Sequence, residues 1–284
     1  MTPLRLGFVP LTDAAPLIAA EALGLFAAEG LTVELSREVS WATIRDKVAV
    51  GALHGAHMLA PMAIAATLGA GSEPAPMVAP LALGTGGAAV TLSVRLTGGA
   101  CLGADLPRLI ARRREAGASP LTFATVFPYS IHSLLLRSWL AGAGLDPDAD
   151  VRIITAPPSR MAGLLADGVI EGFAAGEPWG GLAEAAGAGR VVVRAADLWK
   201  RAPDKVFGVA EAWAEREPQA LTALLRALLA AAAWCDEAAN RQALADLLAR
   251  PEHVDAPPEV IARGLAHVVF RRGAASAPRI PDAV

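Results

Sequence analysis

Cysteine is nearly absent from this sequence, which holds only Cys101 and Cys235 among its 284 residues. Both lie in apolar, alanine-rich surroundings. Because a free cysteine packs like a small hydrophobic residue, we expect two buried thiols, with a single disulfide as the alternative. The two cysteines do not have the spacing of metal ligands, and the five histidines form no HExxH pattern. We therefore expect neither a metal site nor a bound cofactor.

Long basic runs and catalytic motifs are also lacking. The formal net charge is −3, and the densest basic run, Arg112-Arg113-Arg114, is typical of the solvated face of a short helix. Direct binding to nucleic acid is therefore not indicated. The sequence has no GxSxG, GxxxxGK or CxxC motif, and the glycines at residues 84–87 lack the spacing of a dinucleotide-binding loop. We do not expect an enzyme.

A signal peptide is not recognisable, because the first residues run directly into a predicted strand without a basic region, an apolar region or a cleavage site. We therefore expect a cytoplasmic protein, with a periplasmic location as the alternative if a leader is missing. Two uncharged stretches, Val48–Ser72 and Pro74–Val94, are long enough to raise the question of a membrane span. Pro61, Pro80 and several glycines interrupt them, which favours strands and helices of a buried sheet.

Short apolar runs that alternate with helical segments make up most of the chain. This rhythm predicts an α/β fold of βα units on mostly parallel sheets. Thr12-Asp13 is expected to cap the first helix, Ser40 to cap a second, and a further helix is expected to start at Glu177. The rhythm predicts one α/β unit inserted in another, with crossings near residues 85 and 196. The expected first lobe is 1–84 with 196–284, the second lobe is 85–195, and a ligand cleft lies at the hinge between them.

Four loops could carry binding chemistry in such a cleft. Trp41 follows a strand and a Ser cap, although a core Trp is the alternative. His132 falls in the first turn of a helix capped by Ser130, where free N–H groups favour an anion; a His satisfied by a backbone carbonyl is the alternative. Lys205, one of only three lysines, points inward or is a surface residue. Glu177 contacts ligand or hinge, or complements the dipole of a helix.

Several stretches together resemble the nitrate/bicarbonate-binding proteins of ABC transporters and their cytoplasmic nitrate-sensor relatives. The resemblance runs from about residue 4 to 213 and rests on His132 and on the stretches 7–13, 34–47, 55–62, 176–179 and 203–206. It implies a type II periplasmic-binding-protein fold that binds nitrate or nitrite. It also implies that Trp41, His132, Pro158 and Lys205 line the pocket, and Lys205 favours nitrate over bicarbonate. The sequence departs from the family at Ala88, where a polar amide is expected, and in its short C-terminal end.

The absence of a recognisable leader makes a cytoplasmic nitrate or nitrite sensor the leading expectation. Its relatives hold an RNA-binding antiterminator and release it when the anion binds. The alternative is the substrate-binding component of an ABC-type nitrate/bicarbonate transporter, whose partner is a permease. An alternative of another class is a cofactor-biosynthesis enzyme on the same fold, with His132 as an acid–base group.

Overall fold

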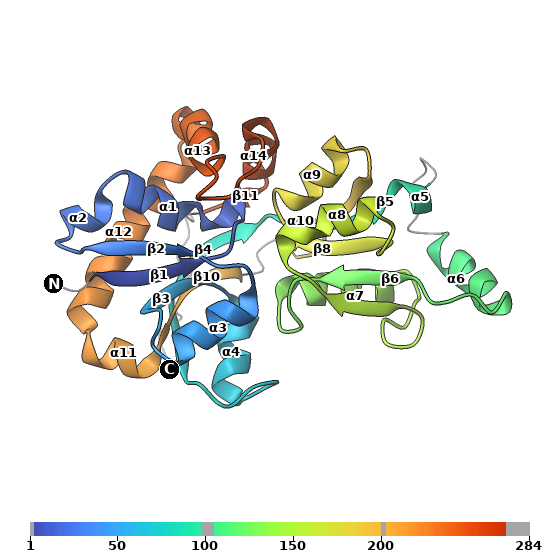
Figure 1. Ribbon diagram of the computed structural model, residues 1–284, viewed down its shortest axis with the longest axis horizontal. Coiled ribbons are helices and arrows are strands. Elements are labelled where there is room, and N and C mark those ends of the chain that lie inside the picture. The colour runs from blue at the N-terminus through green and yellow to red at the C-terminus, as the bar shows by residue number, and fades with distance from the viewer. Residues whose placement is uncertain (1–2, 98–104, 200–202, 271–284) are drawn as a thin grey trace, which may run out of the picture.

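The computed structural model describes residues 3–97, 105–199 and 203–270. These residues form two lobes, each built on one β-sheet (Figure 1). The first sheet has the order β11-β4-β10-β3-β1-β2 and the second the order β7-β6-β8-β5-β9. The strands are β1 Leu4–Phe8, β2 Val33–Arg37, β3 Gly55–Leu59, β4 Met77–Gly86, β5 Ala88–Ser93, β6 Thr122–Thr125, β7 Arg152–Thr155, β8 Gly172–Gly176, β9 Gly189–Arg194, β10 Pro203–Ala210 and β11 Val268–Val269.

Helices cover the faces of both sheets, as expected for βα units (Figure 1). They are α1 Ala15–Ala22, α2 Leu25–Ala28, α3 Trp41–Ala49, α4 Ala60–Leu68, α5 Val94–Thr97, α6 Leu106–Glu115, α7 Ile131–Gly142, α8 Met161–Ala166, α9 Trp179–Ala185, α10 Ala195–Leu198, α11 Glu211–Arg216, α12 Pro218–Asp236, α13 Arg241–Leu248 and α14 Pro258–Leu265, with 3-10 turns η1 Thr12–Ala14, η2 Pro158–Arg160 and η3 Ala238–Asn240. The two-lobed α/β fold predicted from the sequence is confirmed.

The sheets are mixed, so the expectation of mostly parallel sheets is wrong. Strands β1, β2 and β3 are parallel, as are β6, β7 and β8. By contrast, β10 runs antiparallel to β3 and β4, and β5 runs antiparallel to β8 and β9. Strands β5 and β10, which run antiparallel to both of their neighbours, are each the first strand that the chain forms after it crosses from the other lobe. Neither is reached by a crossover helix from its own sheet, and a parallel neighbour would need one.

Two crossings connect the lobes close to the boundaries that we propose at 84/85 and 195/196. The first runs from β4 into β5 through Gly86 and Gly87, whose φ angles of 82° and 74° suit glycine. The second runs from α10 towards β10. A third feature also joins the lobes: one buried apolar cluster includes Trp41 and Met58 of the first lobe with Phe127 and Met161 of the second. The lobes are therefore packed against each other, and apolar residues are buried at their interface.

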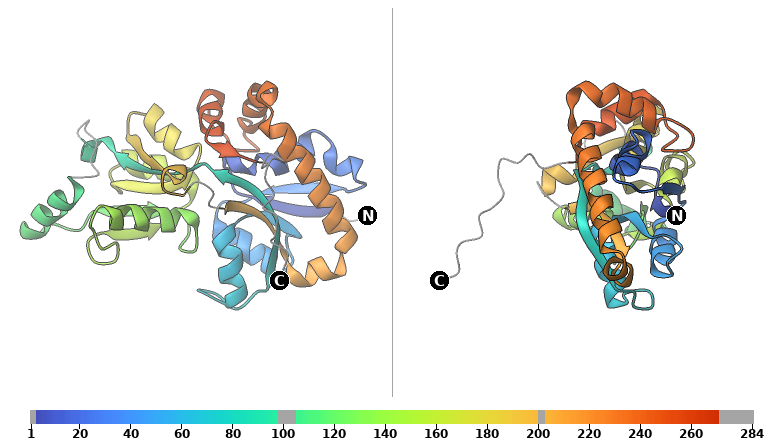
Figure 2. Two further views of the ribbon diagram at one scale, coloured as in Figure 1. Left: turned by 180° about the vertical axis from the view of Figure 1, so that it is seen from behind. Right: turned by 90° about the vertical axis from the view of Figure 1, so that its left-hand side faces the viewer.

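Helix α12 is long and apolar enough, by length and composition, to qualify as a membrane span, and it is the one such helix in the described ranges. Its buried residues recur along one face, and they belong to the core cluster of the first lobe. The helix packs against α1 and α2 (Figure 2, left). We therefore interpret α12 as a core helix. Val48–Ser72 and Pro74–Val94 form strands and helices of the two lobes, as expected.

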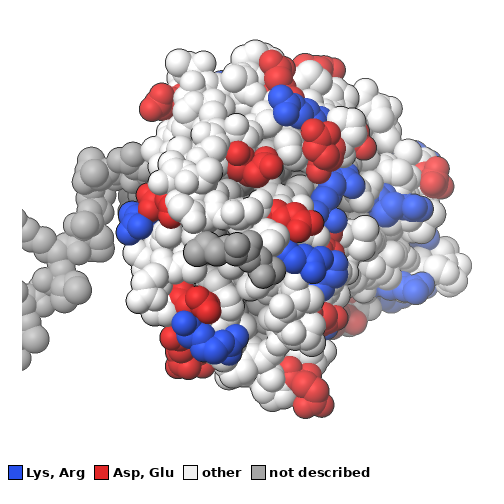
Figure 3. Space-filling model, turned by 60° about the vertical axis from the view of Figure 1, so that its left-hand side comes forward, with Lys and Arg blue, Asp and Glu red and all other residues white. Residues whose placement is uncertain are grey.

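The face shown in Figure 3 carries acidic and basic side chains close to one another, separated by wide uncharged areas. This face has no extended patch of one sign. The clustering of charge that matters for the candidate site lies inside the molecule.

Candidate functional site

Lys205 is completely buried at the start of β10, which makes the surface alternative wrong. Its Nζ lies 2.8 Å from Asp13 Oδ2 and 2.8 Å from Asp204 Oδ1. Lysine is almost never fully buried unless it is paired, because desolvation of an ammonium group is costly. Two carboxylates that are themselves buried provide the pairing.

Asp204 and Lys205 are neighbours in a strand, where successive side chains normally point to opposite faces. The pairing of β10 with β4 is irregular here: the register shifts between Pro203 and Lys205 and again before Val206. Such a bulge re-aims side chains. It explains how two adjacent residues can hold their charged groups in contact.

Asp13 also contacts His57, whose Nε2 lies 3.0 Å from Asp13 Oδ1. The His57 ring lies next to Trp41, with 5.2 Å between ring centroids, and Lys205 Nζ lies 5.7 Å from the centroid of the Trp41 ring. Asp13 therefore connects residues of η1, β3 and β10, and Trp41 covers the resulting cluster.

Sequence reasoning missed three members of this cluster: Asp13, His57 and Asp204. The expected Thr12-Asp13 cap is wrong, because no side chain caps η1 or α1. The signals that could have found Asp13 and His57 were their positions just after β1 and within β3, inside stretches that carry the family resemblance.

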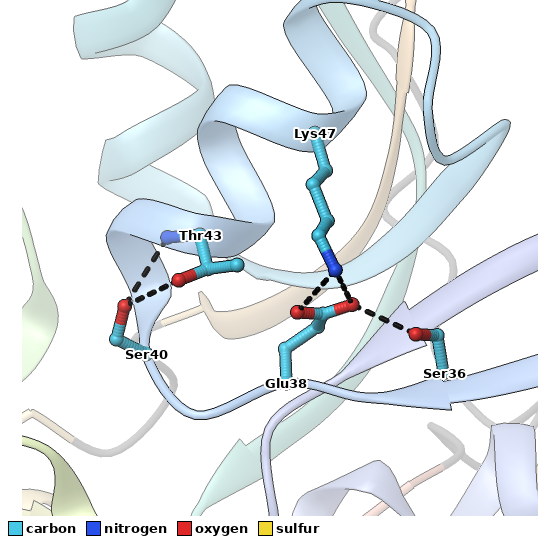
Figure 4. Close-up of polar contacts among 5 residues, drawn as sticks. All are labelled: Ser36, Glu38, Ser40, Thr43 and Lys47. Atoms are coloured by element: carbon cyan, nitrogen blue, oxygen red, sulfur yellow. Dashed lines mark hydrogen bonds and ion pairs between the residues drawn. The ribbon is translucent and has the colours of Figure 1, made fainter.

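Trp41 is the first residue of α3, and local contacts fix the start of this helix (Figure 4). Ser40 Oγ accepts a hydrogen bond from the Thr43 N–H at 3.2 Å, which confirms the predicted cap. In the preceding loop, both Glu38 oxygens accept from Lys47 Nζ at 2.7 and 2.9 Å, and one accepts from Ser36 Oγ. These contacts hold the loop on both sides of the turn that delivers the Trp41 ring.

We predict that Ser40→Ala lowers the free energy of unfolding by about 1 kcal/mol, the usual cost of losing an N-cap. Urea unfolding at pH 7 measures this loss. Ser40→Asp keeps a side-chain acceptor and is expected to lose less. Equal losses in the two variants would contradict a capping role.

His132 lies in the first turn of α7, and Ser130 Oγ accepts from the Ser133 N–H at 3.0 Å, as predicted. The His132 ring is completely buried, and neither of its nitrogens has a hydrogen-bond partner among the described residues. The same holds for Trp41 Nε1 and Thr125 Oγ1. The alternative of a His satisfied by a backbone carbonyl is therefore not observed. Buried polar atoms without partners are rare, so each suggests a ligand or an ordered water.

Gly176 at the end of β8 lies between the two sets of residues. A Cβ atom placed on it would lie 3.6 Å from His132 Nε2 and 3.5 Å from Asp13 Oδ2. A ring of the second lobe and a carboxylate of the first therefore both border the same glycine. The same Cβ atom would lie only 2.6 Å from Leu11 Cδ2, so the absence of a side chain at Gly176 lets Leu11 of the first lobe pack closely against the second.

Pro158 and Ala88, two further predicted residues, are both buried near this edge of the second lobe. Pro158 begins η2 shortly after β7 ends at Thr155, at the same carboxyl edge as the ends of β6 and β8. Ala88 pairs with Gly176 in the antiparallel β5–β8 register. Ala88 supplies no side-chain donor here, so its contribution to a site is limited to shape and backbone.

Glu177 lies at the junction of the lobes. Its carbonyl oxygen accepts hydrogen bonds from the Thr12 N–H at 2.9 Å and from Thr12 Oγ1 at 3.2 Å. Its carboxylate is 2.6 Å from the guanidinium of Arg194 in its own lobe. A cis peptide links it to Pro178, and the expected helix is present as α9, which begins at Trp179, shortly after the predicted start at Glu177. Its contacts place it at the hinge rather than in the cluster.

Burial and pairing set the charges of the cluster. Burial lowers the pKa of His57, and it lowers the pKa of His132 well below its usual range, so both rings are neutral near pH 7. Burial raises the pKa of Asp13, but Lys205 and His57 outweigh it and hold this pKa below its usual range. For Lys205, burial opposes the charge, while Asp13 and Asp204 raise its pKa. Near pH 7 the cluster thus contains a charged ammonium group, that of Lys205, and an ionised carboxylate, that of Asp13.

No group of three or more metal-ligating side chains is arranged to hold a metal ion in the part of the chain described. Cys235 is buried and free, and Cys101 lies outside the described residues. The cluster around Lys205, together with Trp41 and His132 beside it, therefore supplies one ammonium group, two carboxyl groups, two imidazoles and an indole N–H. This set can hold a small polar ligand through donors from both lobes.

Comparison with known proteins places this chain in a family. The NMT1-like family model matches residues 1–249. The nitrate import ATP-binding protein NrtC of Synechocystis is 39% identical over 263 residues, which cover 92% of this chain and 39% of that protein. The bicarbonate transport ATP-binding protein CmpC of Synechococcus elongatus is 37% identical over 260 residues, which cover 91% of this chain and 39% of that protein.

A solved structure agrees over the full fold. The crystal structure of the periplasmic nitrate-binding protein NrtA from Synechocystis superposes with a TM-score of 0.87 at 33% identity, and the match covers 93% of this chain and 70% of that one. The chain spans only about two fifths of the two transport proteins named above. The match to NrtA nevertheless confirms the fold of a periplasmic binding protein, and with the family model it shows that the chain belongs to the NMT1-like family.

Proposed function

We propose that this chain binds nitrate in the buried interface between its lobes. The observation that carries the proposal is the buried Lys205, which lies in one cluster with Trp41 while His132 faces it from the other lobe. Nitrate is a planar, singly charged anion. An ammonium group can supply its charge partner, and the N–H groups of Trp41 and His132 can donate hydrogen bonds to its oxygens. Charge-assisted hydrogen bonds contribute roughly 1.5–3 kcal/mol each.

Hydrogen bonds from both lobes to one anion would also favour the closed arrangement. The lobes already meet through Thr12 and Glu177 and through Trp179, whose Nε1 donates to the Pro10 carbonyl at 3.1 Å. A ligand that contacts residues of both lobes stabilises the closed state by its differential affinity for it.

We further propose that nitrate binding serves transport, as the substrate-binding part of an ABC-type system with a permease as partner. The two curated relatives are named as transport proteins, and the solved relative is described as periplasmic and nitrate-binding. These names favour the transport alternative over the sensor with its antiterminator partner, and the periplasmic alternative over the cytoplasmic expectation. They give no support to the cofactor-biosynthesis enzyme.

We predict that nitrate raises the unfolding temperature selectively. A ligand at a hundred times its Kd adds about 2.7 kcal/mol of stability, a shift of several degrees for a chain of this size. Thermal unfolding in nitrate, nitrite, bicarbonate and sulfate at equal ionic strength measures the effect. A shift with bicarbonate alone would assign a different anion, and no shift with any of them would overturn the proposal.

Co-purification separates the transport and sensor roles. A transport component is expected to bind its permease in membranes prepared from cells that express both proteins, and nitrate is expected to change that binding. Capture of an RNA-binding protein that dissociates when nitrate is added would instead support the sensor.

A further inference from the structure

The buried cluster has an excess of carboxyl groups for a site that receives an anion. Lys205 is its one permanent cation, and Nζ already contacts the two carboxyl groups of Asp13 and Asp204 at 2.8 Å each. All three side chains are completely or almost completely buried. The remaining titratable groups that face them, His57 on β3 and His132 on α7, are neutral near pH 7 because burial lowers the pKa of each ring.

A further negative charge in this cluster needs compensation. With both carboxyl groups ionised, the cluster carries a net charge of −1 before any anion enters. Like charges in a water-poor site repel strongly because little solvent screens them. Addition of an anion beside a second ionised carboxylate would therefore be unfavourable unless one carboxyl group takes a proton.

Resting on the proposed function, we propose that the site binds its anion together with one proton, and that Asp204 is the group that receives the proton. Asp13 is the less suitable group, because each of its oxygens lies close to a different group: Oδ2 is 2.8 Å from Lys205 Nζ and Oδ1 is 3.0 Å from His57 Nε2. Among the described residues, Asp204 has one ion-pair partner, the ammonium group of Lys205. A protonated Asp204 also gains an O–H group, which can donate a hydrogen bond to a nitrate oxygen.

The titration of Asp204 agrees with this assignment. Burial raises the pKa of its carboxyl group to about 6; Lys205 opposes the shift and Asp13 adds to it. Asp204 is therefore mostly ionised in the free protein above pH 7, and a nearby anion shifts the pKa further upward. At a pH between the pKa of Asp204 in the free protein and its pKa in the complex, anion binding takes up close to one proton.

Calorimetry of nitrate binding at pH 7.5 in two buffers of different ionisation enthalpy, such as HEPES and Tris, counts the protons. We expect uptake of roughly 0.5 to 1 proton per nitrate ion, because the pKa of one group, Asp204, rises on binding. We also expect the Kd to rise towards tenfold per pH unit between about pH 7 and 8.5. Binding whose heat is the same in both buffers, with a Kd that is constant over this range, would overturn the inference alone. Absence of nitrate binding from pH 5.5 to 8.5 would overturn both this inference and the proposed function.

Variants identify the proton acceptor. Asp204→Asn keeps the shape of the side chain and a donor, so we expect nitrate binding without proton uptake and a Kd that is independent of pH. Asp148→Asn, a change of an exposed carboxylate paired with Arg137, is the matched control and is expected to retain the proton uptake of the unchanged protein. Undiminished proton uptake in Asp204→Asn would overturn the assignment to Asp204. If Asp204→Asn does not fold, the buffer comparison on the unchanged protein still decides whether a proton accompanies the anion.

Discussion

Lys205→Met is expected to lower nitrate affinity by a factor of about 30 or more, the largest effect on binding that we predict for a single change. The variant keeps a long apolar stem but removes the ammonium group that lies between Asp13 and Asp204. Loss of one partner from a buried, hydrogen-bonded charge pair costs roughly 2–5 kcal/mol in binding, which corresponds to about 30-fold to several thousandfold. Isothermal titration with nitrate at pH 6 measures the loss.

Folding has to be separated from binding in this variant, because Lys205→Met leaves two buried carboxyl groups without their cation. The double variant Asp204→Asn/Lys205→Met removes one of these carboxyl groups and is expected to fold better while still failing to bind nitrate. Arg226→Met is the matched control, because it removes a cation that is exposed on α12 and pairs with Glu29, away from the cluster. It is expected to bind nitrate like the unchanged protein. Full nitrate affinity in a folded Lys205→Met variant would remove Lys205 from the site.

The features that the sequence predicted well are local. Ser40 and Ser130 cap α3 and α7 because an N-cap depends only on the next three residues. The alternation of strands and helices was predicted for the same reason, since periodicity acts within a window of a dozen residues. Trp41, His132 and Lys205 stood out by their position, and the structure buries all three where the lobes meet.

The features that the sequence did not predict depend on contacts between distant segments. Asp13 resembles a helix cap until β3 and β10 place His57 and Lys205 against it. Asp204 was considered only as a neighbour of Lys205, because strict strand alternation puts it on the opposite face and only the irregular register with β4 brings it back. The antiparallel strands at the crossings were also missed, since their direction is set by how the chain passes between the lobes.

Asp13→Asn is expected to lower the free energy of unfolding by about 3–5 kcal/mol, the usual cost of removing one partner from a buried ion pair. For a chain of this size the unfolding temperature would fall by on the order of 10 °C. The asparagine side chain has nearly the same shape, so the loss reports the charge that holds Lys205 and His57 rather than a cavity. Asp148→Asn removes an exposed carboxylate and should leave the unfolding temperature unchanged.

The difference in the free energy of unfolding between Asp13→Asn and the unchanged protein should also depend on pH, and it should shrink as the pH falls. Because the pKa of Asp13 is lowered in the fold, its carboxylate contributes stability that is complete above the pKa of an unfolded aspartate, near 3.9, and is lost as the pH falls through the lower folded value. Urea unfolding of both proteins is expected to give the full difference between pH 5 and 8 and a shrinking difference below pH 4. A difference that stays constant down to pH 2 would mean that the Asp13 charge does not stabilise the fold, and that the buried lysine is held by Asp204 alone.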